Sequence, residues 1–363
     1  MNIEGQRPKT QNRNKIDWQN VSRVLVIRLR SIGDTVLSTP SLIALRRFLP
    51  DAQIDILLED WVAPILEGFD SVDNILSIGK QPIERLRTAQ KIRRTRYDVV
   101  FNLHGGTTST MLTCATGARH RVGYSDYQYS FLYSHLLSSS ADFWNKEKTH
   151  SAEQQLALLG FVGIPIDGQR RTSLVVSEKA HSSLQQKYPL RKPYALIHPA
   201  SLFHTKQWSA ENFARIVDYL ANRGVHVVAV AAPVESSVLT ALAEAARSPV
   251  TIADDLSLTE ITALAADADL FVGNDSGIAH IAAAAGTPTV VIFGSSNRDH
   301  WRPWTDAPNE IVFNPFECQP CPGYECKVYG EPKCILSVSS DQVIAAIDRV
   351  LAPKIKGEPE PAF

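Results

Sequence analysis

The chain has 363 residues, of which 44 % are hydrophobic and 21 % charged, and these totals indicate a globular protein long enough for two domains. The formal net charge of -1 excludes an overall electric field that would recruit nucleic acid or an anionic membrane. The first twenty residues lack the apolar segment of a secretory signal, and no apolar run is long enough for a membrane span, so we expect a cytoplasmic protein.

Strand-like and helix-like segments alternate along the first half of the chain, after a polar tail over residues 1–20 that we expect to be loose. Strands are predicted over 23–29, 52–58, 74–78, 98–103 and 119–124, and helices over 41–48 and 83–94. Thr39 and Pro40 are typical of a helix start, so the helical segment after the first strand should bend or restart there. This alternation predicts a parallel sheet covered by helices.

The alternation begins again near residue 191. Strands are predicted over 194–199, 225–231, 250–252, 269–273 and 287–294, and helices over 210–222, 235–246, 276–285 and 341–351. The sequence "SLTE" at Ser257–Glu260 is a capping box that begins one more helix.

The fold class is therefore α/β, with two doubly wound domains that we place at residues 21–175 and 176–338. A helix over 339–352 and a tail over 353–363 follow. Ligands of such sheets bind beyond the carboxyl ends of the strands, so a cleft between the domains is the expected site.

The segment "GNDSGIAH", residues 273–280, joins a predicted strand to a predicted helix. The free N–H groups of a helix start bind anions, and a glycine lets a phosphate approach the backbone. Asp275, Ser276, Gly277 and His280 are therefore candidates for phosphate binding, with His280 one turn after Ser276. The alternative is that Asp275 or Ser276 only caps the helix and His280 only packs.

Asp34 follows the first strand in "RLRSIGDTVLSTP". It could be a partner of a helix dipole or, opposite a phosphate-binding helix across the cleft, a general base. Lys206, in "HPASLFHTKQW", could neutralise a diphosphate or lie solvated at the surface. Glu235 could accept hydrogen bonds from ribose hydroxyls or favour the start of a helix.

Other patterns are less specific. No GxGxxG follows the first strand and no GxxxxGK[ST] occurs, which disfavours a dinucleotide oxidoreductase and a P-loop nucleotidase. "DAD" at Asp267–Asp269 is interpreted as structural rather than metal-binding. The basic run at residues 84–96 indicates a solvated helix face or contact with an anionic acceptor or membrane.

Four cysteines, Cys318, Cys321, Cys326 and Cys334, lie close together in the sequence. Their density is typical of a structural zinc site, although the spacing differs from a standard zinc ribbon. Free or oxidised thiols are the alternative.

Three segments resemble the lipopolysaccharide heptosyltransferases of glycosyltransferase family 9: "VLVIRLRSIGDTVLSTPSLIALRRFLP", "HPAS…KQW" and "GNDSGIAHIAAAAGTPTVVIFG". The resemblance covers about residues 21–351 and implies the GT-B fold, in which two Rossmann-like domains face a cleft and a C-terminal helix returns to the first domain. It also implies a metal-independent, cofactor-free, inverting transfer of heptose from ADP-heptose to the lipopolysaccharide inner core, with possible contact with the inner membrane.

The resemblance further implies roles for individual residues. Asp34 would be the general base, and Lys206 would bind the phosphates of the donor. Asp275, Ser276, Gly277 and His280 would hold the phosphates and sugar of the donor. By looser matches, Glu235 would contact the ribose and Ser201 a phosphate. In "NLHGG", Asn102 stands where many members carry aspartate, in the region that faces the acceptor.

Three alternatives stay open at this point. The first is a transferase of the same family with another nucleotide sugar or acceptor. The second is a GT-B-like sugar-nucleotide epimerase, with His104 and His198 as further acid or base groups in the cleft. The third is a degenerate transferase that serves as a scaffold.

Overall fold

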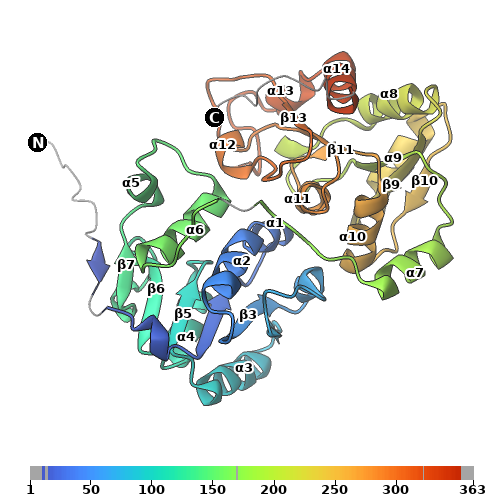
Figure 1. The fold of residues 1–363 in the computed structure, drawn as a ribbon. Coiled ribbons are helices and arrows are strands. Elements are labelled where there is room, and N and C mark those ends of the chain that lie inside the picture. The colour runs from blue at the N-terminus through green and yellow to red at the C-terminus, as the bar shows by residue number, and fades with distance from the viewer. Residues whose placement is uncertain (1–9, 13–14, 169–170, 322, 353–363) are drawn as a thin grey trace, which may run out of the picture.

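The computed structural model describes residues 10–12, 15–168, 171–321 and 323–352. Its strands form two separate sheets, one in each half of the chain (Figure 1). The first sheet has the order β1-β7-β6-β5-β2-β3-β4 and is parallel except for the antiparallel β1. The second has the order β10-β9-β8-β11-β12-β13 and is parallel throughout. The α/β fold class and its two doubly wound halves are thus confirmed.

The strands of the first sheet are β1 (Gln11–Asn12), β2 (Arg23–Ile27), β3 (Gln53–Glu59), β4 (Asn74–Ile78), β5 (Val99–Asn102), β6 (His120–Tyr124) and β7 (His135–Leu137). The helices of this half are η1 (Trp18–Asn20), α1 (Ile32–Val36), α2 (Thr39–Phe48), η2 (Ala63–Leu66), α3 (Pro82–Thr95), α4 (Thr107–Ala115), η3 (Ser130–Leu132), α5 (Ser140–Trp144) and α6 (Ser151–Phe161). The expected restart before α2 is present, with Pro40 in its first turn.

The strands of the second sheet are β8 (Tyr194–His198), β9 (His226–Val230), β10 (Thr251–Ala253), β11 (Leu270–Asn274), β12 (Thr289–Ile292) and β13 (Asn309–Val312). Its helices are α7 (Glu178–Lys187), η4 (His204–Lys206), α8 (Ala210–Ala221), η5 (Pro233–Glu235), α9 (Ser236–Ala245), α10 (Leu258–Asp267), α11 (Gly277–Ala284), α12 (Arg298–Trp301), α13 (Lys333–Leu336) and α14 (Ser340–Leu351). The expected boundary near residue 175 falls between α6 and α7.

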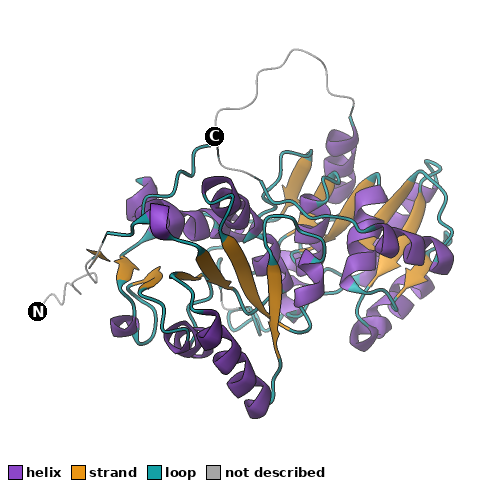
Figure 2. Ribbon diagram, turned by 60° about the horizontal axis from the view of Figure 1, so that its bottom comes forward, coloured by secondary structure: helices purple, strands orange, loops and turns teal. Residues whose placement is uncertain are grey.

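Helices cover both faces of each sheet, as Figure 2 shows, so the strands between them are buried on two sides. In β2, Val24 and Val26 pack toward one side and Leu25 and Ile27 toward the other, and all four are fully buried. Such continuous apolar strands are typical of parallel sheets between two helix layers. The carboxyl ends of β2 and β11 carry α1 and α11, and these two helices pack against each other.

Two expectations about the ends of the chain are wrong. Within the N-terminal tail, Gln11 and Asn12 pair with β7, and Trp18 donates a 3.1 Å hydrogen bond from Nε1 to the carbonyl of Val162, so this part is not loose. The C-terminal helix α14 packs on β12, β13 and α8 of the second half instead of returning to the first. The apolar side of α14 packs against the hydrophobic core of the second half. Residues 1–9 and the tail 353–363 lie outside the described residues.

Asp267 and Asp269 have the structural roles expected. Asp269 accepts a 3.0 Å hydrogen bond from the backbone N–H of Tyr194, and Asp267 lies 2.9 Å from Nε2 of His181. Of the helices described, none is both long and apolar enough to cross a bilayer.

Candidate functional site

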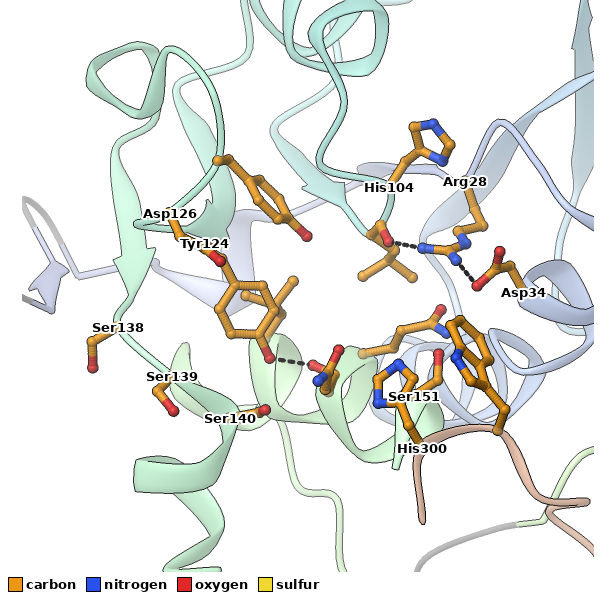
Figure 3. A pocket seen from close by; sticks show the side chains of 16 residues that line it. Arg28, Asp34, His104, Tyr124, Asp126, Ser138, Ser139, Ser140, Ser151 and His300 are labelled. Carbon is orange, nitrogen blue, oxygen red and sulfur yellow. Dashed lines mark hydrogen bonds and ion pairs between the residues drawn. The ribbon is translucent and has the colours of Figure 1, made fainter. Parts of the chain in front are cut away.

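Two cavities adjoin each other beside α1. The larger, of about 700 Å³, lies between the halves and is lined by the ends of β8, β9 and β11 and by α1. The smaller, of about 360 Å³, lies in the first half and is closed by His300 and Trp301 of α12 (Figure 3). Asp34 and Trp301 line both cavities.

All eight residues singled out from the sequence line the larger cavity: Asp34, Ser201, Lys206, Glu235, Asp275, Ser276, Gly277 and His280. They come from the ends of four strands in two different sheets, so only the tertiary fold brings them together. The sequence did not point to Trp61 or to the apolar segments 230–234 and 256–258, which also line this cavity.

The loop that carries Lys206 is fixed by a buried asparagine. Asn274, fully buried at the end of β11, donates a 2.8 Å hydrogen bond from Nδ2 to the carbonyl of Pro199. Its Oδ1 accepts a 3.1 Å hydrogen bond from the backbone N–H of Trp208. Because one side chain holds both ends of the loop, Lys206 is oriented toward the cavity. Its Nζ forms a 2.8 Å ion pair with Asp275.

The start of α11 lies at the floor of the larger cavity. Ser276 is its N-cap residue, but the hydroxyl makes no capping bond and lies 3.0 Å from Nδ1 of His198. Complete burial lowers the pKa of His198 to about 4, so this imidazole is neutral at pH 7. The simple capping explanation for Ser276 is therefore wrong, and Ser276, Gly277 and Ile278 at the start of α11 line the cavity.

The two glycines near the cavity allow α1 and α11 to pack closely. A Cβ on Gly33 would lie 2.7 Å from Cδ2 of His280, and a Cβ on Gly277 would lie 2.7 Å from Cβ of Ile32. Gly277 thus makes room for a side chain of the other half. His280 is buried, its Nδ1 has no hydrogen-bond partner, and desolvation lowers its pKa.

Asp34 is both a helix-start residue and a cavity residue. Its Oδ2 accepts hydrogen bonds from the backbone N–H of Ser31 at 3.2 Å and from its hydroxyl at 3.1 Å. Arg28 forms an ion pair with the other carboxylate oxygen (Figure 3). These contacts fix the carboxylate, whose side chain keeps 17 % of its surface exposed, at the boundary of the two cavities.

The smaller cavity is polar and was not predicted from the sequence. Figure 3 shows His104, Tyr124, Asp126 and His300 around it. Burial lowers the pKa of His104 and of His300, so both are neutral near pH 7.

Asn102 itself does not line this cavity, although Leu103 and His104 of the same "NLHGG" segment do. It is fully buried, and its Oδ1 accepts hydrogen bonds from the backbone N–H groups of His104 and Gly105. Nδ2 donates to the hydroxyls of Ser109 and Tyr133. Asn102 therefore shapes the loop that presents His104.

The four clustered cysteines line one small cavity behind the Lys206 loop. All are free thiols. Among the described residues, which omit Pro322 within this loop, no three His, Cys, Asp or Glu side chains come together closely enough to hold a metal ion. The cysteine arrangement in this structure does not fit a zinc site.

Comparisons with known proteins agree with this geometry. The family described as glycosyltransferase family 9 (heptosyltransferase) matches residues 85–330. This chain belongs to glycosyltransferase family 9. It is therefore a glycosyltransferase enzyme, which removes the basis for the scaffold alternative.

Individual relatives match most of the length of this chain. Lipopolysaccharide heptosyltransferase 3 of Escherichia coli K12 is 29 % identical over 356 residues, which cover 89 % of this chain and 96 % of the relative. The solved structure of Escherichia coli ADP-heptose lipopolysaccharide heptosyltransferase II has a TM-score of 0.77 at 21 % identity and covers 90 % of this chain and 98 % of its own. A family 9 glycosyltransferase from Veillonella parvula has a TM-score of 0.78 at 19 % identity, covering 91 % and 97 %. The GT-B fold is thus confirmed.

Proposed function

We propose that this glycosyltransferase transfers a heptose from ADP-heptose to a sugar of the lipopolysaccharide inner core, with inversion at the anomeric carbon and without a metal. The position of Asp34 at the boundary of two cavities carries the proposal, since a base between donor and acceptor needs that position. The name of the Escherichia coli relative, lipopolysaccharide heptosyltransferase 3, supports the choice of sugar and acceptor.

In this proposal the larger cavity holds the donor. The diphosphate lies at the start of α11 beside Lys206, where backbone N–H groups and the ammonium group counter its charge. Ser201 contacts a phosphate, and Asp275 and His280 orient the heptose. Glu235 binds the ribose, and the apolar segments 230–234 and 256–258 enclose the base.

The acceptor enters the smaller cavity and presents a hydroxyl group to Asp34. The carboxylate takes the hydroxyl proton while the oxygen attacks the anomeric carbon from the face opposite the nucleotide. The bond from that carbon to the diphosphate oxygen breaks, and ADP leaves with the negative charge. Lys206 and the α11 N–H groups stabilise that charge through preorganised electrostatics. One displacement through an oxocarbenium-like transition state gives inversion.

The epimerase alternative has less support from the site. His198 is neutral, buried and hydrogen-bonded to Ser276, and His104 lines the cavity on the far side of Asp34. His198 does line the larger cavity, but its Nδ1 is bonded to Ser276, and His104 does not line that cavity, so a pair of histidines facing one sugar there has no support.

The acceptor is lipid-linked in this proposal, so we also propose that α3 contacts an anionic membrane surface. Ile83 and Leu86 are about half exposed on this helix, among Arg85, Arg87 and Lys91. Flotation with vesicles that contain anionic lipid should carry the wild type upward, and Leu86→Glu should reduce the bound fraction. Equal flotation of both proteins would contradict this contact.

The main test is nucleotide release from ADP-heptose, with ADP-glucose and UDP and GDP sugars in parallel, in the presence of a deep-rough lipopolysaccharide acceptor. Of the nucleotide sugars tested, we expect only ADP-heptose to give acceptor-dependent release of its nucleotide. NMR should show that the product has inverted configuration at the anomeric carbon. Because the structurally similar glycosyltransferase TibC of Escherichia coli is described as iron-containing, a chelator arm is included, and we expect unchanged turnover. Release of altered sugar without any acceptor would support the epimerase instead.

A further inference from the structure

The smaller cavity contains hydrogen-bonding groups that have no partner. Gln155 lies on α6, lines this cavity and is 4 % exposed, and neither Nε2 nor Oε1 of its amide has a hydrogen-bond partner. Nε of Arg28 and Nδ1 of His104, in the same lining, are also buried and unpartnered. An unmet buried polar group costs about 1–3 kcal/mol, so three such groups around one cavity indicate a polar ligand.

The neighbouring Gln154 shows that the lack of hydrogen-bond partners is particular to the Gln155 side chain and does not extend along the helix. Gln154 lines the same cavity, but its Nε2 donates to the Thr149 hydroxyl at 3.5 Å. Its backbone carbonyl accepts a 2.6 Å hydrogen bond from the Tyr124 hydroxyl, drawn in Figure 3. The helix backbone is therefore anchored here, while the Gln155 amide is left available.

The charges of the cavity lining exclude a strong anion site. Arg28, Asp34 and Asp126 are its ionised side chains, and Arg28 is already paired with Asp34. His104 and His300 are neutral near pH 7 because burial lowers the pKa of each. Among the described residues that line this cavity, no cation is free to neutralise a phosphate or a carboxylate.

The chemistry of the amide selects between ligand classes. An amide offers donors on Nε2 and an acceptor on Oε1, and adjacent sugar hydroxyls can satisfy both at once. A phosphate or carboxylate only accepts hydrogen bonds, so Oε1 would stay unmet and Asp126 would repel the anion.

We propose that the smaller cavity takes a neutral sugar ring of the acceptor, and that Gln155 selects this ring by hydrogen bonds to two neighbouring hydroxyl groups. The inference rests on the proposed function, which assigns this cavity to the acceptor. It specifies that the sugar bearing the attacking hydroxyl carries neither phosphate nor carboxylate at the positions that Gln155 contacts.

The test is calorimetric binding to the full chain with ADP present. The probes are two core oligosaccharides that differ only in their terminal heptose, which is unsubstituted in one and phosphorylated in the other. We expect the wild type to bind the neutral probe about tenfold more tightly or better. Gln155→Met, which keeps length and volume, should weaken binding of the neutral probe by about tenfold or more and leave the phosphorylated probe nearly unchanged.

Two further variants serve as controls. Gln185→Met makes the same change at an exposed position of α7 and should leave both affinities unchanged. Gln155→Glu keeps the hydrogen-bond-accepting oxygens, so its affinity for the neutral probe should lie between those of the wild type and Gln155→Met even if the latter folds poorly. Equal or tighter binding of the phosphorylated probe, or unchanged neutral binding in both Gln155 variants, overturns the inference.

The binding readout separates this inference from the proposed function. A protein that transfers heptose but binds both probes equally contradicts the role of Gln155 alone. Selective binding of the neutral probe without any turnover contradicts the proposed transfer, while the assignment of the cavity to a neutral sugar stands.

Discussion

The carboxylate of Asp34 is held by contacts with the protein and also lines both cavities. Oδ2 accepts two hydrogen bonds from Ser31, and the opposite oxygen pairs with Arg28. An asparagine at this position retains a carbonyl oxygen for the Ser31 N–H but carries no charge and is no base. The change to asparagine therefore separates the helix-start role from proton transfer.

Asp34→Asn should lower acceptor-dependent ADP release by about a hundredfold or more, the scale of losing a general base. Its thermal unfolding midpoint should fall as well, because Arg28 loses the charge of its partner, so release is compared at a temperature well below unfolding of both proteins. The matched control is Glu84→Gln, because Glu84 accepts a hydrogen bond from the Gln81 N–H at the start of α3, far from both cavities. Near-normal turnover in Asp34→Asn would reduce Asp34 to a helix-start residue.

Lys206 is held by Asp275, which also accepts a hydrogen bond from the hydroxyl of Ser296. A cation in this position can stabilise charge on the leaving diphosphate, so its removal should affect turnover more than acceptor binding. Lys206→Met should lower kcat by about tenfold to a thousandfold at an unchanged acceptor KM. Lys192→Met, at an exposed position beside Asp267, is the control. A change confined to the acceptor KM would contradict the assignment to the diphosphate.

At the scale of elements, α1 and α11 are held in contact by two glycines. An added methyl on Gly33 would meet the ring of His280, which lines the donor cavity. Gly33→Ala should therefore cost about 1–3 kcal/mol of stability and also weaken binding of ADP, because His280 must shift.

Gly224 provides the comparison for that variant. It has a φ of +76° with no atom within 4 Å of an added Cβ, so Gly224→Ala costs stability only through backbone strain. Urea unfolding and ADP titration of both variants should show two destabilised proteins but only one with weakened nucleotide binding. Normal ADP affinity in Gly33→Ala would show that His280 is not positioned through this contact.

The same elements show how far the sequence could be interpreted. Most strands were predictable because buried parallel strands are continuous apolar runs, but the short β1 and β7 and the partly polar β13 were not predicted. The SLTE capping box correctly predicted the start of α10. Helix α4 was missed because "TTSTMLTCA" is rich in β-branched and hydroxyl residues of low helix propensity. Helix α6 was missed because it is buried on nearly all sides and so lacks an amphipathic period.

The two cavities also differ in how far their lining residues could be predicted from the sequence. The residues of the larger cavity follow strand ends, a position that sequence patterns reveal, so the eight candidates could be named in advance. The smaller cavity combines side chains from α1, β6, α6 and α12 and from the loops that follow β2 and β5, and the residues of β6, α6 and α12 belong to no local motif. The resemblance placed the segment of Asn102 toward the acceptor, and Leu103 and His104 of that segment do line the smaller cavity, whereas the four side-chain hydrogen bonds of Asn102 fix a loop.

At the scale of the whole molecule, buried histidines make the fold sensitive to mild acid. Burial lowers the pKa of His198 and of His135 to about 4 and that of His150 to about 3. A free histidine titrates near 6.5, so the unfolded chain binds more protons than the folded one between the two values. Stability is therefore fully present above about pH 6.5 and falls as the pH falls toward 4.

The free energy of unfolding in urea should consequently decrease from pH 7 to pH 5, by up to about 2 kcal/mol for each of these histidines. Glu260 does not add to the change in unfolding free energy between pH 7 and pH 5. Its pKa is lowered to about 2, so its contribution to stability is lost only in stronger acid. His198→Asn can keep the hydrogen bond to Ser276 without a titrating group, so its unfolding free energy should depend less on pH. An identical slope in this variant and the wild type would show that His198 does not contribute to acid sensitivity.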